Sequence, residues 1–161
     1  TFTAPSFESR RRRTRLRTSS AASPNTYAAN MRAVDTNILV RLITRDDEAQ
    51  TVAAERFVAP GAWVSVLVLA EATWVLATVY ALKRKQIALA VEMLLAHERL
   101  VIQDANVVST ALSDFRRASM VGFSECLVLA LARAAGHLPL GTFDRKLSKL
   151  EGAVSPAAEE D

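Results

Sequence analysis

From Met31 onward, short runs rich in β-branched residues alternate with longer stretches that repeat apolar residues at helical spacing. The β-like runs occupy residues 32–34, 63–66, 100–102 and 138–143. The helical stretches occupy residues 37–44, 48–58, 67–80, 87–96, 106–118, 125–135 and 146–150. Strands separated by helices favour a parallel sheet that helices cover on both faces. We therefore expect a three-layer α/β/α fold with a short central parallel sheet of about four to five strands.

Composition divides the chain into three segments. Residues 1–30 lack apolar periodicity and hold six arginines but one acid, which predicts a disordered basic extension. Residues 31–150 predict a single domain, and residues 151–161 a small polar tail. Three interpretations of the extension remain open: an artefact of an upstream start with Met31 as the natural start, a basic arm that contacts phosphates, or a targeting peptide.

Several classes of protein and site are disfavoured by composition. No apolar run approaches the roughly 18 residues of a membrane span, so we expect a soluble, cytoplasmic protein without membrane contact. Cys126 is the chain's one cysteine, which excludes an internal disulfide and argues against a cysteine-based zinc site; its apolar neighbours predict a core position. His97 and His137 have polar or helix-end surroundings and are poor candidates for a general base. The glycines form no nucleotide-binding loop.

Four acids are candidates for a functional site. Asp35 and Asp144 each follow a β-like run directly, while Glu71 and Glu125 lie near helix starts among apolar neighbours. Taken singly, each has an ordinary explanation as a helix cap or a partner of the helix dipole. Because sites in parallel sheets form at the carboxyl ends of strands, however, the acids are expected to converge. Gathered carboxylates need a cation, and oxygen ligands suit Mg²⁺ or Mn²⁺.

The segments around these acids resemble the PIN-domain family, and specifically the VapC-type toxins of bacterial toxin–antitoxin modules. The resemblance is carried by residues 31–41, by Val64-Ser65 with Leu69-Ala70-Glu71, by residues 122–127 and by residues 141–144, and it extends over nearly all of residues 31–150. This chain departs from the family pattern at Glu125, where an aspartate is usual, and at Gly122, where many relatives have another acid. Since Mg²⁺ demands near-ideal geometry, the longer Glu125 puts full activity in question.

The resemblance implies a metal-dependent endoribonuclease that cleaves RNA phosphodiester bonds with Mg²⁺ or Mn²⁺. It implies that Asp35, Glu71 and Asp144 bind the metal and that Glu125 either binds it or orients the attacking water. The side chains expected to support these acids through hydrogen bonds are Thr36, Asn37 and Thr142. The basic residues expected to hold the RNA phosphates are Arg41, Arg45, Arg116 and Arg145.

The resemblance also implies partners, namely a cognate antitoxin and a second copy in a homodimer, with helices 48–58 and 67–80 as the expected contact areas. Two other functions stay open. A structure-specific DNA nuclease is disfavoured because the domain is too short for additional elements. A non-catalytic module that retains affinity for RNA or antitoxin is kept open by Glu125.

Overall fold

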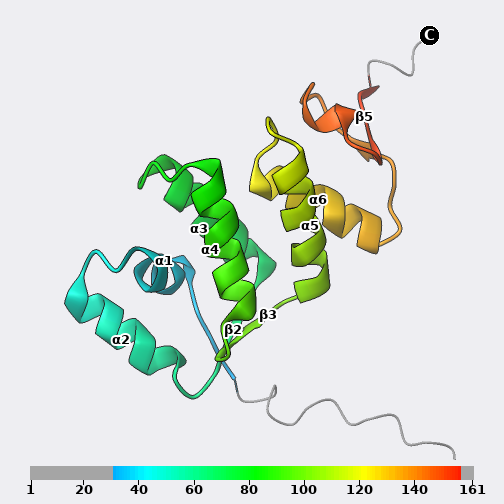
Figure 1. Ribbon diagram of the computed structural model, residues 1–161. Helices are drawn as coiled ribbons and strands as arrows, with labels where there is room; N and C mark the ends of the chain where they lie inside the picture. The colour runs from blue at the N-terminus through cyan, green and yellow to red at the C-terminus, as the bar shows by residue number, and fades with distance from the viewer. Residues whose placement is uncertain (1–30, 157–161) are drawn as a thin grey trace, which may run out of the picture. The chain divides into compact units, whose positions relative to one another are not determined.

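The computed structural model describes residues 31–156, and in them five short strands alternate with six α-helices (Figure 1). In chain order the elements are β1 (Arg32–Ala33), α1 (Thr36–Thr44), α2 (Glu48–Val58), β2 (Ala62–Val64), α3 (Val66–Thr78), α4 (Arg84–Ala96), β3 (Leu100–Ile102), α5 (Ala105–Arg117), α6 (Phe123–Ala134), β4 (Leu140–Gly141), a 3-10 turn (Leu147–Lys149) and β5 (Ala153–Val154). The expected α/β class with parallel strands is confirmed. The predictions for residues 1–30 and 157–161 fall outside the described residues.

The five strands are divided between two parallel sheets. In the first, β2 lies between β1 and β3; Ala62 aligns with Arg32 on one side and with Leu100 on the other. In the second, β4 pairs with β5, and the Thr142 N–H donates to the Val154 carbonyl at 2.9 Å. The sequence pattern favours one central sheet instead. It also assigns residues 151–161 to a polar tail, yet this segment supplies β5 because its backbone pairs with β4.

Side-chain caps set the starts of the first three helices. The carboxylates of Asp35 and Asp47 accept the N–H groups of Ile38 and Gln50, at 3.2 and 2.9 Å. The hydroxyl of Ser65 does the same for α3. Such caps satisfy backbone donors that a helix start leaves unpaired, which explains why these helices begin within a residue of the predicted positions.

Two later helices begin earlier than the sequence predicts. The sequence predicts a helix from residue 87, but α4 already begins at Arg84, with Gln86 accepting the Lys83 N–H at 2.7 Å. The sequence predicts the next of these helices from residue 125, but α6 begins at Phe123 after Gly122. The Phe123 side chain is buried in the core, and this packing explains why α6 begins two residues earlier than predicted.

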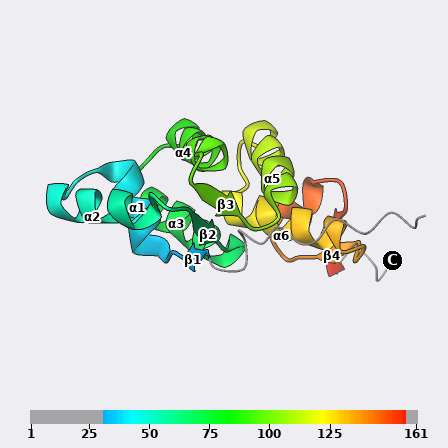
Figure 2. The ribbon, with the colours of Figure 1, turned by 90° about the horizontal axis from the view of Figure 1, so that it is seen from below.

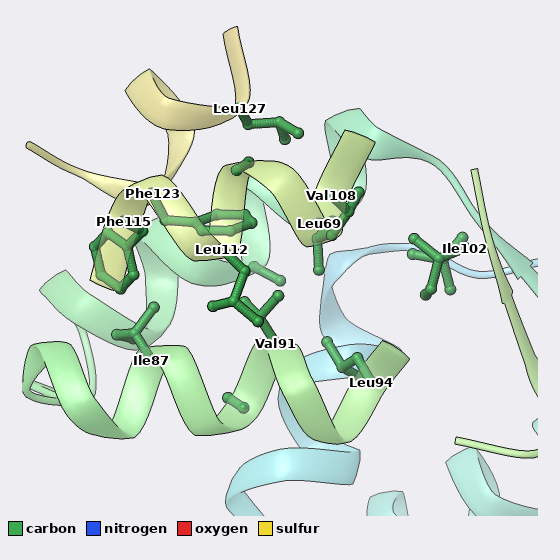
Figure 3. Packing of buried hydrophobic residues seen from close by; sticks show 14 of the residues in the cluster. Leu69, Ile87, Val91, Leu94, Ile102, Val108, Leu112, Phe115, Phe123 and Leu127 are labelled. Carbon is green, nitrogen blue, oxygen red and sulfur yellow. The ribbon is translucent and has the colours of Figure 1, made fainter. Parts of the chain in front are cut away.

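The core lies mainly between α3, α4, α5 and α6 (Figure 3). Phe115 of α5 meets Phe123 of α6 edge to face, with ring centroids 5.8 Å apart. Figure 2 shows α4 and α5 on one side of the β1–β2–β3 sheet, with α2 and β4 at opposite ends of the domain. Cys126 is fully buried, as its apolar neighbours predict. None of the helices in residues 31–156 is long and apolar enough to cross a bilayer.

Candidate active site

Asp35 stands where β1 ends and α1 begins. Its side chain is exposed, and one carboxylate oxygen accepts the Ile38 N–H at 3.2 Å. The preceding Val34 is buried, and its N–H donates to the Trp63 carbonyl of β2 at 3.0 Å. The sheet therefore holds the backbone of Asp35 from one side while the helix start holds its side chain from the other. Its position at the carboxyl end of a parallel strand is the predicted one.

Thr36 connects this strand end to α3. Its buried hydroxyl donates a 2.7 Å hydrogen bond to Oε2 of Glu71, whose side chain is exposed. The helices α1 and α3 pack against each other, so the bond is supported by the surrounding core. A hydroxyl donor fixes the orientation of the carboxylate and leaves its remaining lone pairs available to a cation. This hydrogen bond therefore links Glu71 of α3 to the residue that directly follows Asp35.

Glu125 has a different environment. It is partly buried in the first turn of α6, and its Oε2 accepts the N–H of Gly122, the residue before the helix. A Cβ atom at residue 122 would lie 2.9 Å from this same oxygen. The absence of a side chain at Gly122 therefore makes room for Glu125 to fold back onto its own helix start. This is the helix-start role that the sequence leaves open for Glu125.

Asp144 follows β4 and opens the 3-10 turn. One carboxylate oxygen accepts the N–H groups of Leu147 and Lys146, at 2.8 and 2.6 Å. These two bonds stabilise the charged form and lower the pKa of the Asp144 carboxyl, although the side chain is exposed. The backbone N–H of Asp144 in turn donates to the Thr142 hydroxyl at 3.0 Å.

The four acids are not gathered around one point. Within residues 31–156, no three side chains of the Asp, Glu, His and Cys types lie close enough to hold one metal ion. Glu125 lies on a helix that packs on α3, and Asp144 belongs to the second sheet. Mg²⁺, however, is often bound through one or two carboxylates, with water and substrate phosphate completing its shell. The donor chemistry of Asp35 and Glu71 fits that mode of binding.

The arginines expected to hold RNA phosphates mostly have acidic partners. Ion pairs join Arg41 to Asp46, Arg45 to Glu55 and Arg116 to Glu92, at 2.8, 2.7 and 2.8 Å. Arg145 and Asn37 are exposed. Since exposed ion pairs contribute little net stability, the guanidinium groups of Arg45 and Arg116 can exchange a carboxylate for a phosphate at small cost.

Two functional candidates were missed by sequence reasoning. The guanidinium of Arg84 lies 3.7 Å from the centroid of the Phe115 ring and donates to the carbonyls of Phe115, Ala118 and Val121. Nothing in the run 83–85 distinguishes this arginine from a surface residue. Trp74 is 61% exposed on α3, and its one sequence signal is a spacing of three residues from Glu71.

Comparison with known families gives one match. The family model described as PIN domain matches residues 32–153. That range contains all four candidate acids and both sheets, except for Val154 at the end of β5. No curated protein matches the chain significantly.

Proposed function

Because this chain belongs to the PIN-domain family, which is a family of nucleases, we propose that it is a Mg²⁺- or Mn²⁺-dependent endoribonuclease that hydrolyses RNA phosphodiester bonds. The observation that carries the proposal is the 2.7 Å bond from Thr36 to Glu71, beside Asp35. This bond orients the Glu71 carboxylate close to Asp35, at the carboxyl end of β1. Sites in parallel sheets form at such strand ends.

Each residue has a defined part in this proposal. Asp35 and Glu71 hold the metal ion, with Thr36 orienting Glu71 and the Ile38 N–H orienting Asp35. Held by these two carboxylates, such an ion would supply positive charge to offset that of the phosphate and to activate water. Asp144 is kept charged by its two backbone bonds, but it follows a strand of the second sheet and would have to move toward Asp35 and Glu71 to reach the same ion. Glu125 can contribute only after its carboxylate leaves the Gly122 N–H.

The biological role that we propose is that of the toxin in a type II toxin–antitoxin pair, with a cognate antitoxin and a homodimer as partners. Its support is the resemblance to VapC-type toxins and the exposed apolar side chains of the two helices expected to make these contacts. Val52 of α2 and Leu67 of α3 are 38% and 74% exposed. Single exposed apolar side chains are common on protein surfaces, so these two support the proposal only through their place on the helices that the resemblance assigns to partners.

A second candidate is a module that binds RNA or antitoxin without cleaving. It is favoured by Glu125, whose carboxylate is engaged at its own helix start, and by the separation of the acids in the described residues. Turnover separates the two candidates, because only the first predicts cleavage of RNA.

The test of the nuclease is cleavage of labelled single-stranded RNA in Mg²⁺, in Mn²⁺ and in EDTA, for the native chain and for Asp35→Asn. We expect cleavage by the native chain with metal and none in EDTA. Asparagine caps a helix about as well as aspartate, so Asp35→Asn should keep its stability within about 0.5 kcal/mol while cleavage falls to background. Asp35→Ala serves as the comparator that loses the cap, at a cost of about 1 kcal/mol.

Thermal unfolding gives a readout that does not need substrate. Millimolar Mg²⁺ or Mn²⁺ should raise the unfolding temperature of the native chain by mass action, and should raise it much less in Asp35→Asn. Cleavage that persists in EDTA or in Asp35→Asn would overturn the assignment. RNA binding without any cleavage would favour the second candidate.

A further inference from the structure

Trp74 presents a large aromatic surface to solvent beside the candidate acids. It lies on the same face of α3 as Glu71, three residues before it, and Leu67, seven residues before it. Its side chain is 61% exposed, whereas Leu69, Ala72 and Leu76 on the opposite face of the helix are buried in the core. An indole ring next to an oriented carboxylate is therefore open to a ligand.

A cavity of about 280 Å³ adjoins this ring. It lies between α3, the start of α4, the end of α5 and the start of α6, and its lining includes Trp74, Arg84, Phe115, Phe123 and Ser124. Figure 3 shows Phe115 and Phe123 close together, with Ile87 of α4 nearby; all three side chains form part of this lining. The surface is mainly apolar and aromatic, with the exposed Ser124 among its few polar groups. A flat, largely apolar ring with polar edges suits such a space.

A second cavity, of about 480 Å³, shares Arg84 and Phe115 with the first. Its walls carry cationic groups on Lys85 and Arg116. Lys85 is exposed, and Arg116 pairs with Glu92 in an ion pair whose two side chains are 48% and 53% exposed. The surface is thus acidic at Glu71 and aromatic at Trp74. It is basic beyond Arg84, where Lys85 and Arg116 lie.

We propose that this surface binds single-stranded RNA, with one nucleobase stacked on Trp74 and neighbouring phosphates held by Lys85 and Arg116, which places the backbone beside Glu71. Aromatic platforms combined with cationic grooves are how proteins bind single strands. A base in a duplex has both faces covered, so the platform selects unpaired bases. The proposal deepens the nuclease function and rests on it. Trp74 is in this view a positioning residue.

Charge distinguishes the surface around Trp74 from the exposed apolar side chains of Val52 and Leu67, and it argues against a protein as its occupant. The buried centres of protein interfaces are depleted of charged residues. Here Glu71 lies one helical turn from the ring, and the second cavity is lined by Lys85, Glu92 and Arg116, so a covering protein would have to supply partners for these charges. RNA instead supplies phosphates to the cations and leaves the acid free for a metal ion.

The experiment measures the affinity of the full chain for a short fluorescein-labelled single-stranded RNA by anisotropy, in EDTA so that no cleavage occurs. Trp74→Ala should weaken binding roughly 5-fold to 100-fold through lost stacking. Trp74→Phe should restore most of the affinity, which a merely structural defect would not allow. Val128→Ala truncates an exposed apolar side chain of α6 that lines neither cavity; it is the control and should bind as the native chain does. Lys85→Ala should reduce the salt dependence of binding by about one phosphate contact.

A second measurement reports on the ring itself. The chain has two tryptophans, so Trp63→Phe leaves Trp74 as its sole indole. Unlabelled single-stranded RNA should quench the emission of this variant, and a matched duplex should quench it much less.

Unchanged RNA affinity in Trp74→Ala overturns the proposal. So does loss of a dimer in Trp74→Ala at unchanged RNA affinity, since that result identifies a protein contact. The result for the Trp74 surface can be distinguished from the result for the nuclease proposal. RNA binding through Trp74 in a native chain that never cleaves supports the platform and refutes the nuclease. Cleavage whose KM is the same in Trp74→Ala supports the nuclease and refutes the platform.

Discussion

Single residues at the candidate site serve the helix starts as well as the proposed chemistry. Asp35, Glu125 and Asp144 each accept a backbone N–H at the beginning of a helical segment. Glu71 differs because a side chain, that of Thr36, orients it. A carboxylate has about four lone-pair sites, so capping by one oxygen does not prevent the other from binding a cation.

At Glu125 we predict that Glu125→Asp maintains or raises RNA cleavage and that Glu125→Gln lowers it. Aspartate is shorter and suits the family pattern, and a displacement of about 1 Å can change a rate by as much as 100-fold. Glutamine retains an oxygen for the Gly122 N–H but loses the charge, so it controls for the helix start. Cleavage rates and Mn²⁺ affinities of the three chains provide the measurement. A slower Glu125→Asp would show a site adapted to glutamate, and equal rates would leave Glu125 a helix-start residue alone.

At the scale of elements, a hydrogen-bond network around Asp46, in the loop between α1 and α2, connects α1 to Tyr80, which follows α3. Its carboxylate accepts hydrogen bonds from Thr44, Tyr80 and Arg41 at 2.7, 2.9 and 2.8 Å. The bonds from Thr44 and then Tyr80 contribute most to lowering the pKa of Asp46 from 3.8 to about 2. A carboxyl with a lower pKa in the folded state stabilises the fold above its unfolded pKa, and that contribution disappears as the pH falls.

We therefore predict that Asp46→Asn is less stable than the native chain at neutral pH and that the difference shrinks as the pH falls from 3.8 to about 2. Tyr80→Phe, which removes one donor, should show a smaller effect of the same sign. Urea unfolding at a series of pH values measures both. A stability difference that stays constant across this window would show that the network does not depend on the charge of Asp46.

The start of α4 and the end of α5 are joined through Arg84. Its guanidinium stacks on Phe115 and satisfies three carbonyls where α5 ends. We predict that Arg84→Lys destabilises the fold by about 2 kcal/mol, because an ammonium cannot stack or reach all three acceptors. Lys85→Ala, one residue along and exposed, should stay within about 0.5 kcal/mol. Equal urea midpoints for Arg84→Lys and the native chain would contradict this assignment.

Local signals account for how well each element was predicted. The bounds of α2 and β3 match the prediction because Asp47 caps one and a short apolar run defines the other. The start of α4 at Arg84 was not predicted because the partner of Arg84, Phe115, is distant in sequence. Likewise the start of α6 depends on Phe123 reaching the core, which no local rule for caps contains.

At the scale of the whole molecule, the order of strands and helices was predictable and the grouping of strands was not. Alternation along the chain is enough to indicate an α/β fold with parallel pairing. The strands β1, β4 and β5 have two residues each, too few side chains to specify which neighbour each one joins. For the same reason the sequence could place Asp35 and Asp144 after strands but not show that the strands belong to separate sheets.

The close approach between residue 122 and Glu125 has a consequence for any side chain placed at position 122. A Cβ there would lie 2.9 Å from Oε2 of Glu125, so it could not share this space with the folded-back carboxylate. The atom that such a side chain would meet is the flexible end of Glu125. A substitution at position 122 would therefore displace the Glu125 carboxylate from the Gly122 N–H and leave the backbone in place. Filling position 122 is thus one way to free the Glu125 carboxylate for another partner.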